Sequence, residues 1–221
     1  MRFDAVVKVG GSLLSAGEPR TLVAALASIA RAHRLVVVPG GGPFADAVRE
    51  ASARHALGDT ASHWMAVLAM DQHAHLLAAM SADATLCMAP QDCAASCDAG
   101  RLAVFAPYSW LRDADPLPHG WHVTSDSIAA WAAGRLGAPR LVLLKAKDGV
   151  RDGQEIRAEA DAVEAAEAGI VDAFLPEVLP PGLECWILDG RRPERLAELL
   201  TAGTTSGTRL RRPASNRRPG A

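Results

Sequence analysis

The sequence has 221 residues, 49% of them hydrophobic, so it is long enough to bury one sizeable core. A net charge of −2 and an aromatic content of 5% argue against a nucleic-acid-binding surface, and no apolar stretch approaches the roughly 20 residues that a membrane span needs. The N-terminus lacks the long apolar region of a signal peptide. We therefore read the cysteines as reduced thiols of a cytoplasmic protein: Cys87, Cys93, Cys97 and Cys185.

The first part of the chain alternates apolar runs with longer mixed stretches. Asp4–Val9 is a near-continuous apolar run that ends at two glycines, and Leu35–Val38 is a second run that ends at Pro39 and three glycines. Apolar runs of this length are typical of strands that are buried on both faces. Helices are expected over Glu18–His33, Pro43–Ala56 and Thr60–Met80.

The rest of the chain continues this alternation. Strands are expected over Ala84–Met88, Leu102–Ala106, Arg140–Lys145 and Cys185–Leu188, with an edge strand over Thr208–Leu210. Helices are expected over Ser125–Leu136, Ala158–Gly169 and Pro193–Ala202, a loop over Pro107–Gly120, and a turn or hairpin over Asp148–Glu155.

Strands that alternate with helices predict an α/β protein, a three-layer α/β/α sandwich with a mainly parallel central sheet. We expect one domain over residues 1–210, with an N-terminal lobe over about 1–120 and a C-terminal lobe over about 121–210. Residues 211–221 are rich in Arg, Pro, Ser and Gly, which predicts a disordered basic tail. Ligands bind open parallel sheets at the carboxyl ends of the strands, so the residues that follow each strand are the candidates for a site.

Lys8, Gly10, Gly11 and Ser12 lie at the end of the first predicted strand. Two glycines let the backbone approach a ligand closely and present N–H groups to an anion, and a lysine just upstream adds positive charge. A simple glycine turn beside a solvated lysine is the alternative. Lys8 lies inside an apolar strand, however, where a charged group needs a partner or a ligand. The segment therefore favours an anion site.

Gly40, Gly41 and Gly42 stand between the second predicted strand and a helix. A single turn does not require three successive glycines, whereas a backbone lying against a phosphate at a helix N-terminus accounts for them. The same letters match the GxGxxA dinucleotide fingerprint, which expects an acidic residue at the end of the next strand. Asp59 is near the right distance but follows a predicted helix, so a nucleotide-dependent oxidoreductase is the weaker interpretation. The GxxxxGK[ST] phosphate loop does not occur in the sequence.

Two further segments place polar and charged side chains at the same edge of the predicted sheet. Thr124, Ser125 and Asp126 begin a predicted helix, where ordinary helix capping is the alternative interpretation. Lys145 ends a predicted strand and Lys147 follows it, just before a predicted turn. Lysines, glycine-rich turns and an acid at the ends of parallel strands suit phosphoryl transfer, because that reaction depends on positioning and on stabilising spread negative charge.

The sequence resembles the amino acid kinase superfamily, which includes acetylglutamate, uridylate and isopentenyl phosphate kinases. The matching segments follow the family's order over nearly the whole chain: Val6–Leu14 (VVKVGGSLL), Val36–Glu50, Val123–Gly137, Leu141–Val150 and Gly207–Leu210 (GTRL). The resemblance implies an α/β/α kinase that uses ATP with Mg²⁺ on a small molecule. We also expect a homo-oligomer, without a nucleic-acid or membrane partner.

The resemblance further implies roles for the matched residues. Lys8 would stabilise the transferring phosphoryl group, Asp126 would orient the lysines, and Lys145 would complete the catalytic set. The nucleotide-binding residues would be Gly10, Gly11, Ser12, Lys145, Lys147, Asp148 and Gly149. Lys145 and Lys147 compete for the nucleotide phosphates, because the family often has one more residue between its lysine and the turn. The acceptor-binding residues would include Gly40, Gly41, Gly42, Thr124 and Ser125.

Within the superfamily, the letters TSDS resemble kinases whose acceptor is already a phosphate monoester. The segments His63–Leu77 and WHVTSDSIAAW are also similar to kinases of methanofuran biosynthesis, which convert an aminomethylfuran phosphate to its diphosphate. A different acceptor (amino acid, nucleotide or isoprenoid phosphate) is one alternative, and a non-catalytic nucleotide-binding subunit is another.

Trp64, Leu68, Asp71 and His75 recur at helical spacing and predict one inward-facing stripe. Asp71 would then be an inward-facing acid that needs a cationic partner, either a substrate ammonium or a structural ion pair. Trp64 and Asp71 are therefore candidate acceptor-binding residues. His73 lies off this stripe and is expected in solvent.

Overall fold

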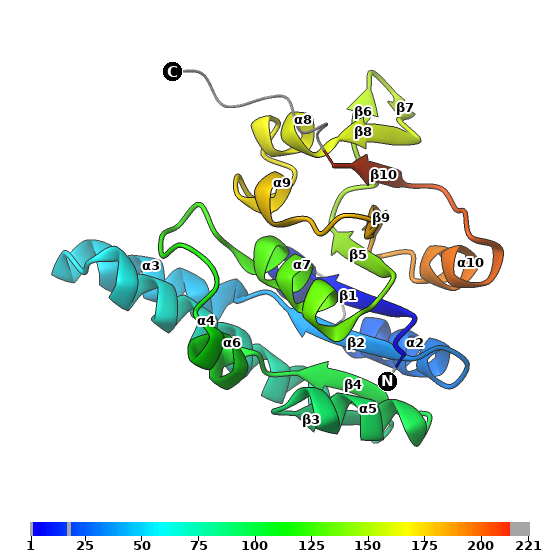
Figure 1. Ribbon diagram of the computed structural model, residues 1–221, viewed down its shortest axis with the longest axis horizontal. Coiled ribbons are helices and arrows are strands. Elements are labelled where there is room, and N and C mark those ends of the chain that lie inside the picture. Colours follow the sequence, from blue (N-terminus) through cyan, green and yellow to red (C-terminus); the bar gives the residue numbers. More distant parts are fainter. Residues whose placement is uncertain (1, 17–18, 213–221) are drawn as a thin grey trace.

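The computed structural model describes residues 2–16 and 19–212, and Figure 1 shows its ribbon. The strands of its main sheet are β1 (Ala5–Val9), β2 (Leu35–Pro39), β3 (Ala84–Cys87), β4 (Leu102–Phe105), β5 (Arg140–Lys145), β8 (Glu159–Asp161), β9 (Glu184–Asp189) and β10 (Thr208–Arg211). They form one eight-stranded sheet in the order β3-β4-β2-β1-β5-β9-β10-β8. β10 is antiparallel to β9, whereas the other neighbouring pairs are parallel.

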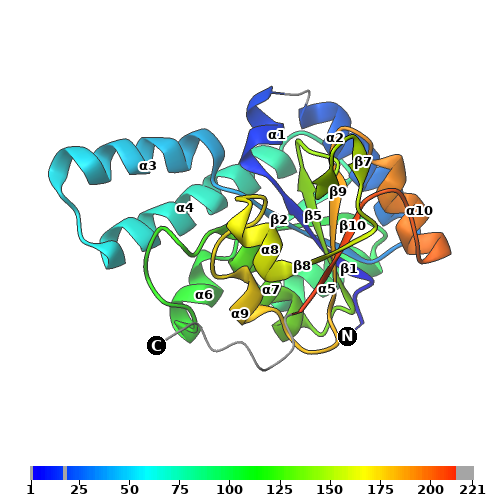
Figure 2. The ribbon, with the colours of Figure 1, turned by 90° about the horizontal axis from the view of Figure 1, so that it is seen from above.

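Helices flank this sheet on both sides, and a short hairpin of β6 (Arg151–Asp152) and β7 (Glu155–Ile156) stands apart from it (Figures 1 and 2). The helices are α1 (Gly11–Ala16), α2 (Pro19–Ala30), α3 (Gly42–His55), α4 (Asp59–Ala78), α5 (Pro90–Asp98), α6 (Tyr108–Ala114), α7 (Ser125–Leu136), α8 (Ala162–Glu167), α9 (Leu175–Val178) and α10 (Glu194–Ala202). The predicted sandwich with a mainly parallel sheet is therefore confirmed.

Several local predictions are wrong. The expected loop Pro107–Gly120 contains helix α6, and the expected helix Ala158–Gly169 begins as strand β8 before it becomes α8. β10 is not an edge strand, because β8 pairs with its outer side. Arg211 belongs to β10 and pairs with Asp161, so the expected tail starts inside a strand. The rest of that tail, residues 213–221, lies outside the described residues.

Two apolar layers hold the sheet. One layer packs residues of α5, α6, α7, α8 and α9 against one face, with Phe105 and Leu143 among its fully buried members. The other packs α2 and α10 against the opposite face, around Leu26 and Leu144. The alternation of Val6 and Val7 between the two layers is the period of two that a strand buried on both faces imposes.

Helix α4 contributes buried residues to both layers, so its buried residues do not form one continuous stripe. Its first turns add Trp64 and Val67 to one layer, and its last turns add Ala74 and Leu77 to the other. The predicted stripe is wrong, because Leu68 is 41% exposed. Figure 2 shows α3 and α4 side by side, extending beyond the sheet.

The register of the central strands brings the predicted segments to one edge. Val9 pairs with Pro39 of β2 on one side and with Leu144 of β5 on the other. The backbone N–H of Gly10 donates to the Leu144 carbonyl at 3.0 Å, and the N–H of Gly40 donates to the Val9 carbonyl at 2.8 Å. Both glycine turns and the end of β5 are therefore fixed beside one another.

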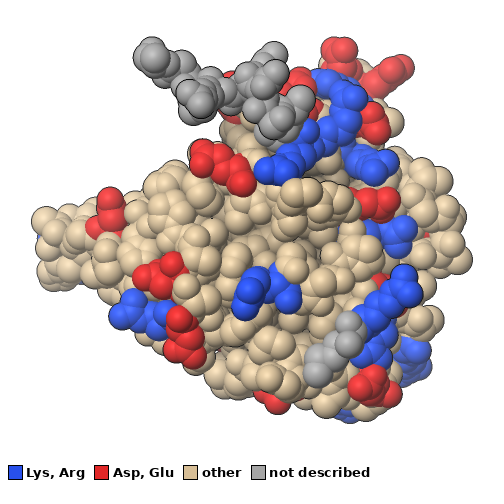
Figure 3. Space-filling model, in the orientation of Figure 1, with Lys and Arg blue, Asp and Glu red and all other residues tan. Residues whose placement is uncertain are grey.

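Basic and acidic side chains are interspersed on the face shown in Figure 3, around a broad area without charged residues. This face carries no continuous field of one sign. Over residues 2–16 and 19–212, none of the helices has the length and apolar character needed to cross a membrane.

Candidate active site

A buried carboxylate joins the two lysines that end β1 and β5. The Oδ1 atom of Asp126 lies 2.8 Å from the Nζ atom of Lys8, and its Oδ2 atom lies 2.5 Å from the Nζ atom of Lys145. Lys8 is 5% exposed and Asp126 is 2% exposed. The sequence contains one further lysine, Lys147, so every lysine of the chain lies at this edge of the sheet. The structure thus brings together the three residues predicted as the catalytic set.

The charges of this triad do not cancel. Burial raises the pKa of Asp126, but the ammonium groups of Lys8 and Lys145 lower it more, and the resulting pKa is about 2. Burial and the neighbouring Lys8 lower the pKa of Lys145, against the opposing effect of Asp126. Two cations share one carboxylate, so the triad itself carries one net positive charge, and the Asp172 carboxylate acts on Lys145 as well. An anionic group would satisfy this excess charge.

Asp172, which no local sequence pattern indicated, fixes the start of α7. Its carboxylate accepts hydrogen bonds from the backbone N–H and hydroxyl of Thr124, at 3.0 and 2.8 Å, and from the N–H and hydroxyl of Ser127. Its own N–H donates to Oδ2 of Asp126 at 3.3 Å. Asp172 follows α8 in the chain, so spacing gave no sign that it reaches a helix formed much earlier in the sequence.

The two glycine turns touch each other, which gives a packing reason for their composition. A Cβ atom on Gly11 would lie 2.6 Å from Cα of Gly42, closer than real contacts allow. Gly42 also has a φ of +49°, and a Cβ there would lie 2.2 Å from Cε1 of His73. His73 is buried and its Nδ1 bonds the Gly40 carbonyl at 2.5 Å. The expectation of a solvated His73 is therefore wrong, because the ring is buried against the glycine turn and bonds its backbone.

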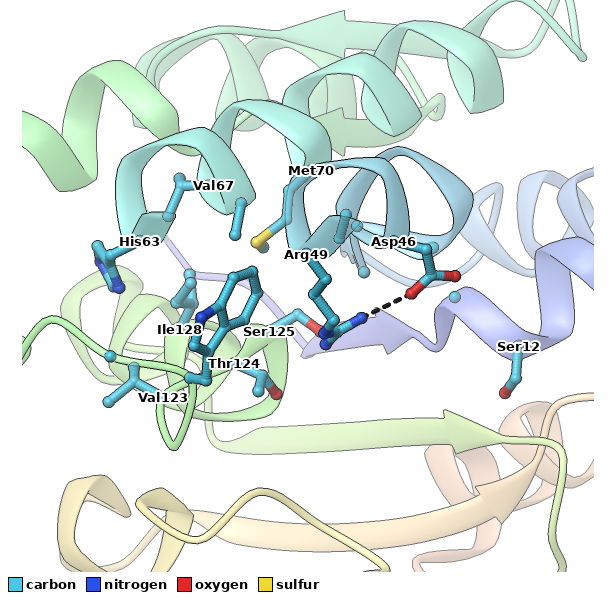
Figure 4. Close-up of a pocket in the computed structure, with 18 residues that line it drawn as sticks. Ser12, Asp46, Arg49, His63, Val67, Met70, Val123, Thr124, Ser125 and Ile128 are labelled. Carbon is cyan, nitrogen blue, oxygen red and sulfur yellow. Dashed lines mark hydrogen bonds and ion pairs between the residues drawn. The ribbon is translucent and has the colours of Figure 1, made fainter. Parts of the chain in front are cut away.

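A cavity of about 530 Å³ opens beside these turns. Figure 4 shows its labelled side chains, with Ser12 at one end, Arg49 and Ser125 in the middle, and His63 at the other end. Its lining residues come from both glycine turns, α3, α4, the segment before α7 and α7 itself: Gly11, Ser12, Gly40, Gly41, Gly42, Ala45, Asp46, Arg49, His63, Ala66, Val67, Met70, Gly120, Trp121, Val123, Thr124, Ser125 and Ile128.

Two predicted acceptor-binding residues, Trp64 and Asp71, are absent from the described lining of this cavity. The carboxylate of Asp71 accepts a hydrogen bond from the N–H of Tyr108 at 3.0 Å, at the start of α6. Burial raises the pKa of Asp71 to about 6. The indole of Trp64 packs against Tyr108 and beneath Arg112, whose guanidinium carbon lies 4.6 Å from the ring centroid. Both side chains thus contact the α6 segment.

A second cavity, of about 470 Å³, lies beyond the end of β5. Its lining includes Lys147, Asp148, Gly149, Arg151, Ala168, Ile170 and Arg191. Asp148 forms ion pairs with Arg151 at 2.9 Å and with Arg195 at 3.4 Å. Lys145 is held by Asp126, whereas Lys147 is exposed at this second cavity, so the two competing lysines face different surroundings.

The segment GTRL locks the turn that lines the second cavity. The hydroxyl of Thr208 accepts a hydrogen bond from the N–H of Val150 at 2.9 Å and donates to the Arg157 carbonyl at 2.7 Å. Gly149 has a φ of +141°, and a Cβ there would lie 2.4 Å from the Thr208 hydroxyl oxygen. The segments LLKAKDGV and GTRL, which were both singled out in the sequence, therefore pack against each other through Gly149, Val150 and Thr208.

Comparison with known proteins identifies the family of this chain and a relative of similar length. The model of the amino acid kinase family matches residues 5–173. The [5-(aminomethyl)furan-3-yl]methyl phosphate kinase of Methanocaldococcus jannaschii is 28% identical over 204 residues, which cover 88% of this chain and 92% of that protein.

Solved structures agree in fold. The uridylate kinase of Archaeoglobus fulgidus superposes with a TM-score of 0.72 at 19% identity, covering 94% of this chain and 100% of that chain. The UMP kinase of Bacillus anthracis gives a TM-score of 0.72 at 13% identity, covering 97% and 98%. The protein belongs to the amino acid kinase family.

Proposed function

We propose that the protein transfers the γ-phosphoryl group of ATP to a small phosphate monoester, and that the acceptor is an aminomethylfuran phosphate. The observation that carries the proposal is the pair of lysines held by one carboxylate next to a cavity large enough for a small organic acceptor. The relative from Methanocaldococcus jannaschii supports this choice of acceptor through its name and its coverage of nearly the whole chain.

The acceptor half of the proposal rests on the first cavity. Arg49 is the one Lys or Arg among the described residues that line it. Its guanidinium pairs with Asp46 at 2.6 Å and lies over the ring of Trp121, 5.1 Å from the centroid. A guanidinium binds phosphate oxygens through two parallel N–H groups, so Arg49 would hold the phosphate of the acceptor near Ser125 and the glycine turns.

The nucleotide half rests on the second cavity. Lys147, Arg151 and Arg191 supply positive charge there for the phosphates of ATP. Lys145 ends β5, two residues before Lys147 of this cavity, and would reach the γ-phosphate. Over the described ranges, no three His, Cys, Asp or Glu side chains cluster to hold a metal ion. Mg²⁺ would therefore arrive with ATP, held mainly by phosphate oxygens, and would neutralise part of their charge.

Members of the triad are close in the chain to lining residues of both cavities. Ser125 of the first cavity precedes Asp126, and Lys147 of the second follows Lys145 by two positions. In the proposed step, an oxygen of the acceptor phosphate attacks the γ-phosphorus, the bond from that phosphorus to the bridging oxygen breaks, and ADP leaves. Lys8 and Lys145 would stabilise the charge on the transferring group, and Asp126 would hold both ammonium groups in place.

The test compares acceptors and one variant. ADP release is measured with the aminomethylfuran phosphate, with the corresponding unphosphorylated alcohol, with UMP and with isopentenyl phosphate. Wild type is expected to use the first compound best and the alcohol very poorly. Arg49→Met should raise the KM of the phosphorylated acceptor roughly 10- to 100-fold, the scale of one hydrogen bond to a charged group, and leave the KM of ATP unchanged.

Arg54→Met is the matched control, because Arg54 is an exposed arginine on the same helix, outside the cavity lining. Equal use of the alcohol and its phosphate would refute the phosphate-monoester class. A preference for UMP or isopentenyl phosphate would keep the class and replace the acceptor. An unchanged acceptor KM in Arg49→Met would remove Arg49 from the phosphate site.

A further inference from the structure

His63 is a buried polar side chain that the proposed phosphoryl transfer leaves unused. It lies in the first turns of α4, is 5% exposed and lines the first cavity. Its ring stacks on His119, with 4.7 Å between centroids, and meets the edge of Trp64 at 4.9 Å. None of the hydrogen bonds among residues 2–16 and 19–212 involves its ring nitrogens. The ring nitrogens of His63 are therefore available to bond a ligand in the cavity.

The ring of His63 is held in position from behind. His119, on which it stacks, bonds the Thr60 hydroxyl through Nδ1 at 3.0 Å and the Asp115 carboxylate through Nε2 at 2.9 Å. Both nitrogens of His119 are therefore occupied, and its ring can offer His63 a flat surface but no further N–H. Of these two rings, His63 is therefore the one whose nitrogens can bond a ligand.

The position of His63 sets what it would contact. Ser12 lies at one end of the cavity and His63 at the other, and the apolar side chains of Val67, Met70 and Ile128 line the part near His63 (Figure 4). A small acceptor whose phosphate lies at Arg49 and the glycine turns would extend its opposite end towards His63. The apolar stretch between suits a flat unsaturated ring.

The charge state of His63 favours a donor as its partner. Burial, assisted by the nearby His119 and opposed by Asp115, lowers the pKa of His63 to about 4. The imidazole is therefore neutral near pH 7, and one ring nitrogen carries a lone pair that accepts a hydrogen bond. A neutral ring also does not repel a cationic group. The one described carboxylate in the lining, Asp46, is already paired with Arg49.

We infer that His63 is a specificity-determining residue that accepts a hydrogen bond from an amine at the end of the acceptor remote from its phosphate. The inference rests on the proposed function, since it presumes a phosphate monoester in this cavity. His63 thus takes the place of Asp71 as the residue proposed to recognise the amine, because the Asp71 carboxylate bonds the start of α6 instead.

The test uses two acceptors that differ in one group: the aminomethylfuran phosphate and its analogue with methyl in place of aminomethyl. Wild type should show a kcat/KM for the amine that is roughly 10-fold or more above that for the methyl compound, as expected for one hydrogen bond to a charged group. His63→Phe keeps a flat ring and removes the acceptor atom. It should abolish this preference by lowering kcat/KM for the amine, mainly through KM, while the methyl analogue is used as before.

His75→Phe is the control, because His75 is exposed on the same helix. A second measurement uses the wild-type protein alone: the ring nitrogen signals of His63 in a ¹⁵N-histidine-labelled sample should shift with the amine and stay in place with the methyl analogue. Unshifted signals, or a loss in His63→Phe that is equal for both acceptors, would overturn the inference and leave the proposed function standing. Equal use of both acceptors by wild type would do the same. If wild type phosphorylates neither, the proposed function fails and the inference fails with it.

Discussion

Replacing Lys8 by Met is expected to lower kcat by about 10²–10³ while the protein stays folded. The loss of one preorganised charged donor at the transferring group is worth about this factor. Met fills nearly the same volume, so the packing of β1 is preserved. The change leaves Asp126 with Lys145 as a one-to-one pair, and the excess positive charge that would meet the γ-phosphate disappears.

The measurement is a steady-state assay at saturating ATP and acceptor, with thermal unfolding as the check on folding. Arg31→Met serves as the control, because Arg31 forms an exposed pair with Asp83 on the surface. Wild-type kcat in Lys8→Met would remove Lys8 from the reaction. A similar loss in Arg31→Met would show that the assay reports stability rather than chemistry.

Asp126→Asn is expected to abolish turnover and to destabilise the fold. The variant buries two ammonium groups without their shared counter-ion, and breaking a buried ion pair in this way costs about 3–5 kcal/mol. For a protein of this size the loss corresponds to a fall in Tm on the order of 10 °C. Differential scanning calorimetry tests the stability and the ADP-release assay tests the turnover. A Tm within a degree of wild type would contradict the burial of both charges.

The same variant should change the dependence of stability on pH. The pKa of Asp126 falls from its ordinary value of 3.8 to about 2 in the folded protein, so its contribution to stability is present above about pH 4 and is lost as the pH falls towards 2. The difference in unfolding free energy between wild type and Asp126→Asn should therefore shrink as the pH falls from 4 to 2. A constant difference over this range would contradict the depressed pKa.

The sequence predicted the elements that carry the strongest local signals. The continuous apolar runs around Val6, Val36 and Leu143 indicated buried strands, and each strand ended close to the predicted residue. Because those strands are parallel, the sequence predicted that Lys8 and Lys145 lie at the same edge of the sheet. The structure adds that β1 and β5 are neighbours, which brings the two lysines together. The position of Asp126 followed from the start of α7, which was predicted correctly.

The parts that could not be predicted depend on contacts between distant segments. α4 contacts two different layers, so its buried residues do not follow one stripe. His73 was expected in solvent and is buried, and the inward-facing Asp71 bonds the start of α6. Strand β8 exists because β10 pairs with it, although its letters read as helix. Asp172 binds α7 across 45 or more positions of sequence, beyond the reach of any local pattern.

The measurement that tests the central claim most directly is phosphorus NMR of the protein with Mg-ATP and the aminomethylfuran phosphate. The account predicts that the monoester signal disappears while ADP and two mutually coupled signals of a new diphosphate grow in equal amounts. ADP accompanied only by inorganic phosphate, with the monoester unchanged, would contradict phosphoryl transfer to this acceptor. The absence of any ADP with every monoester tried would contradict the kinase assignment of the site itself.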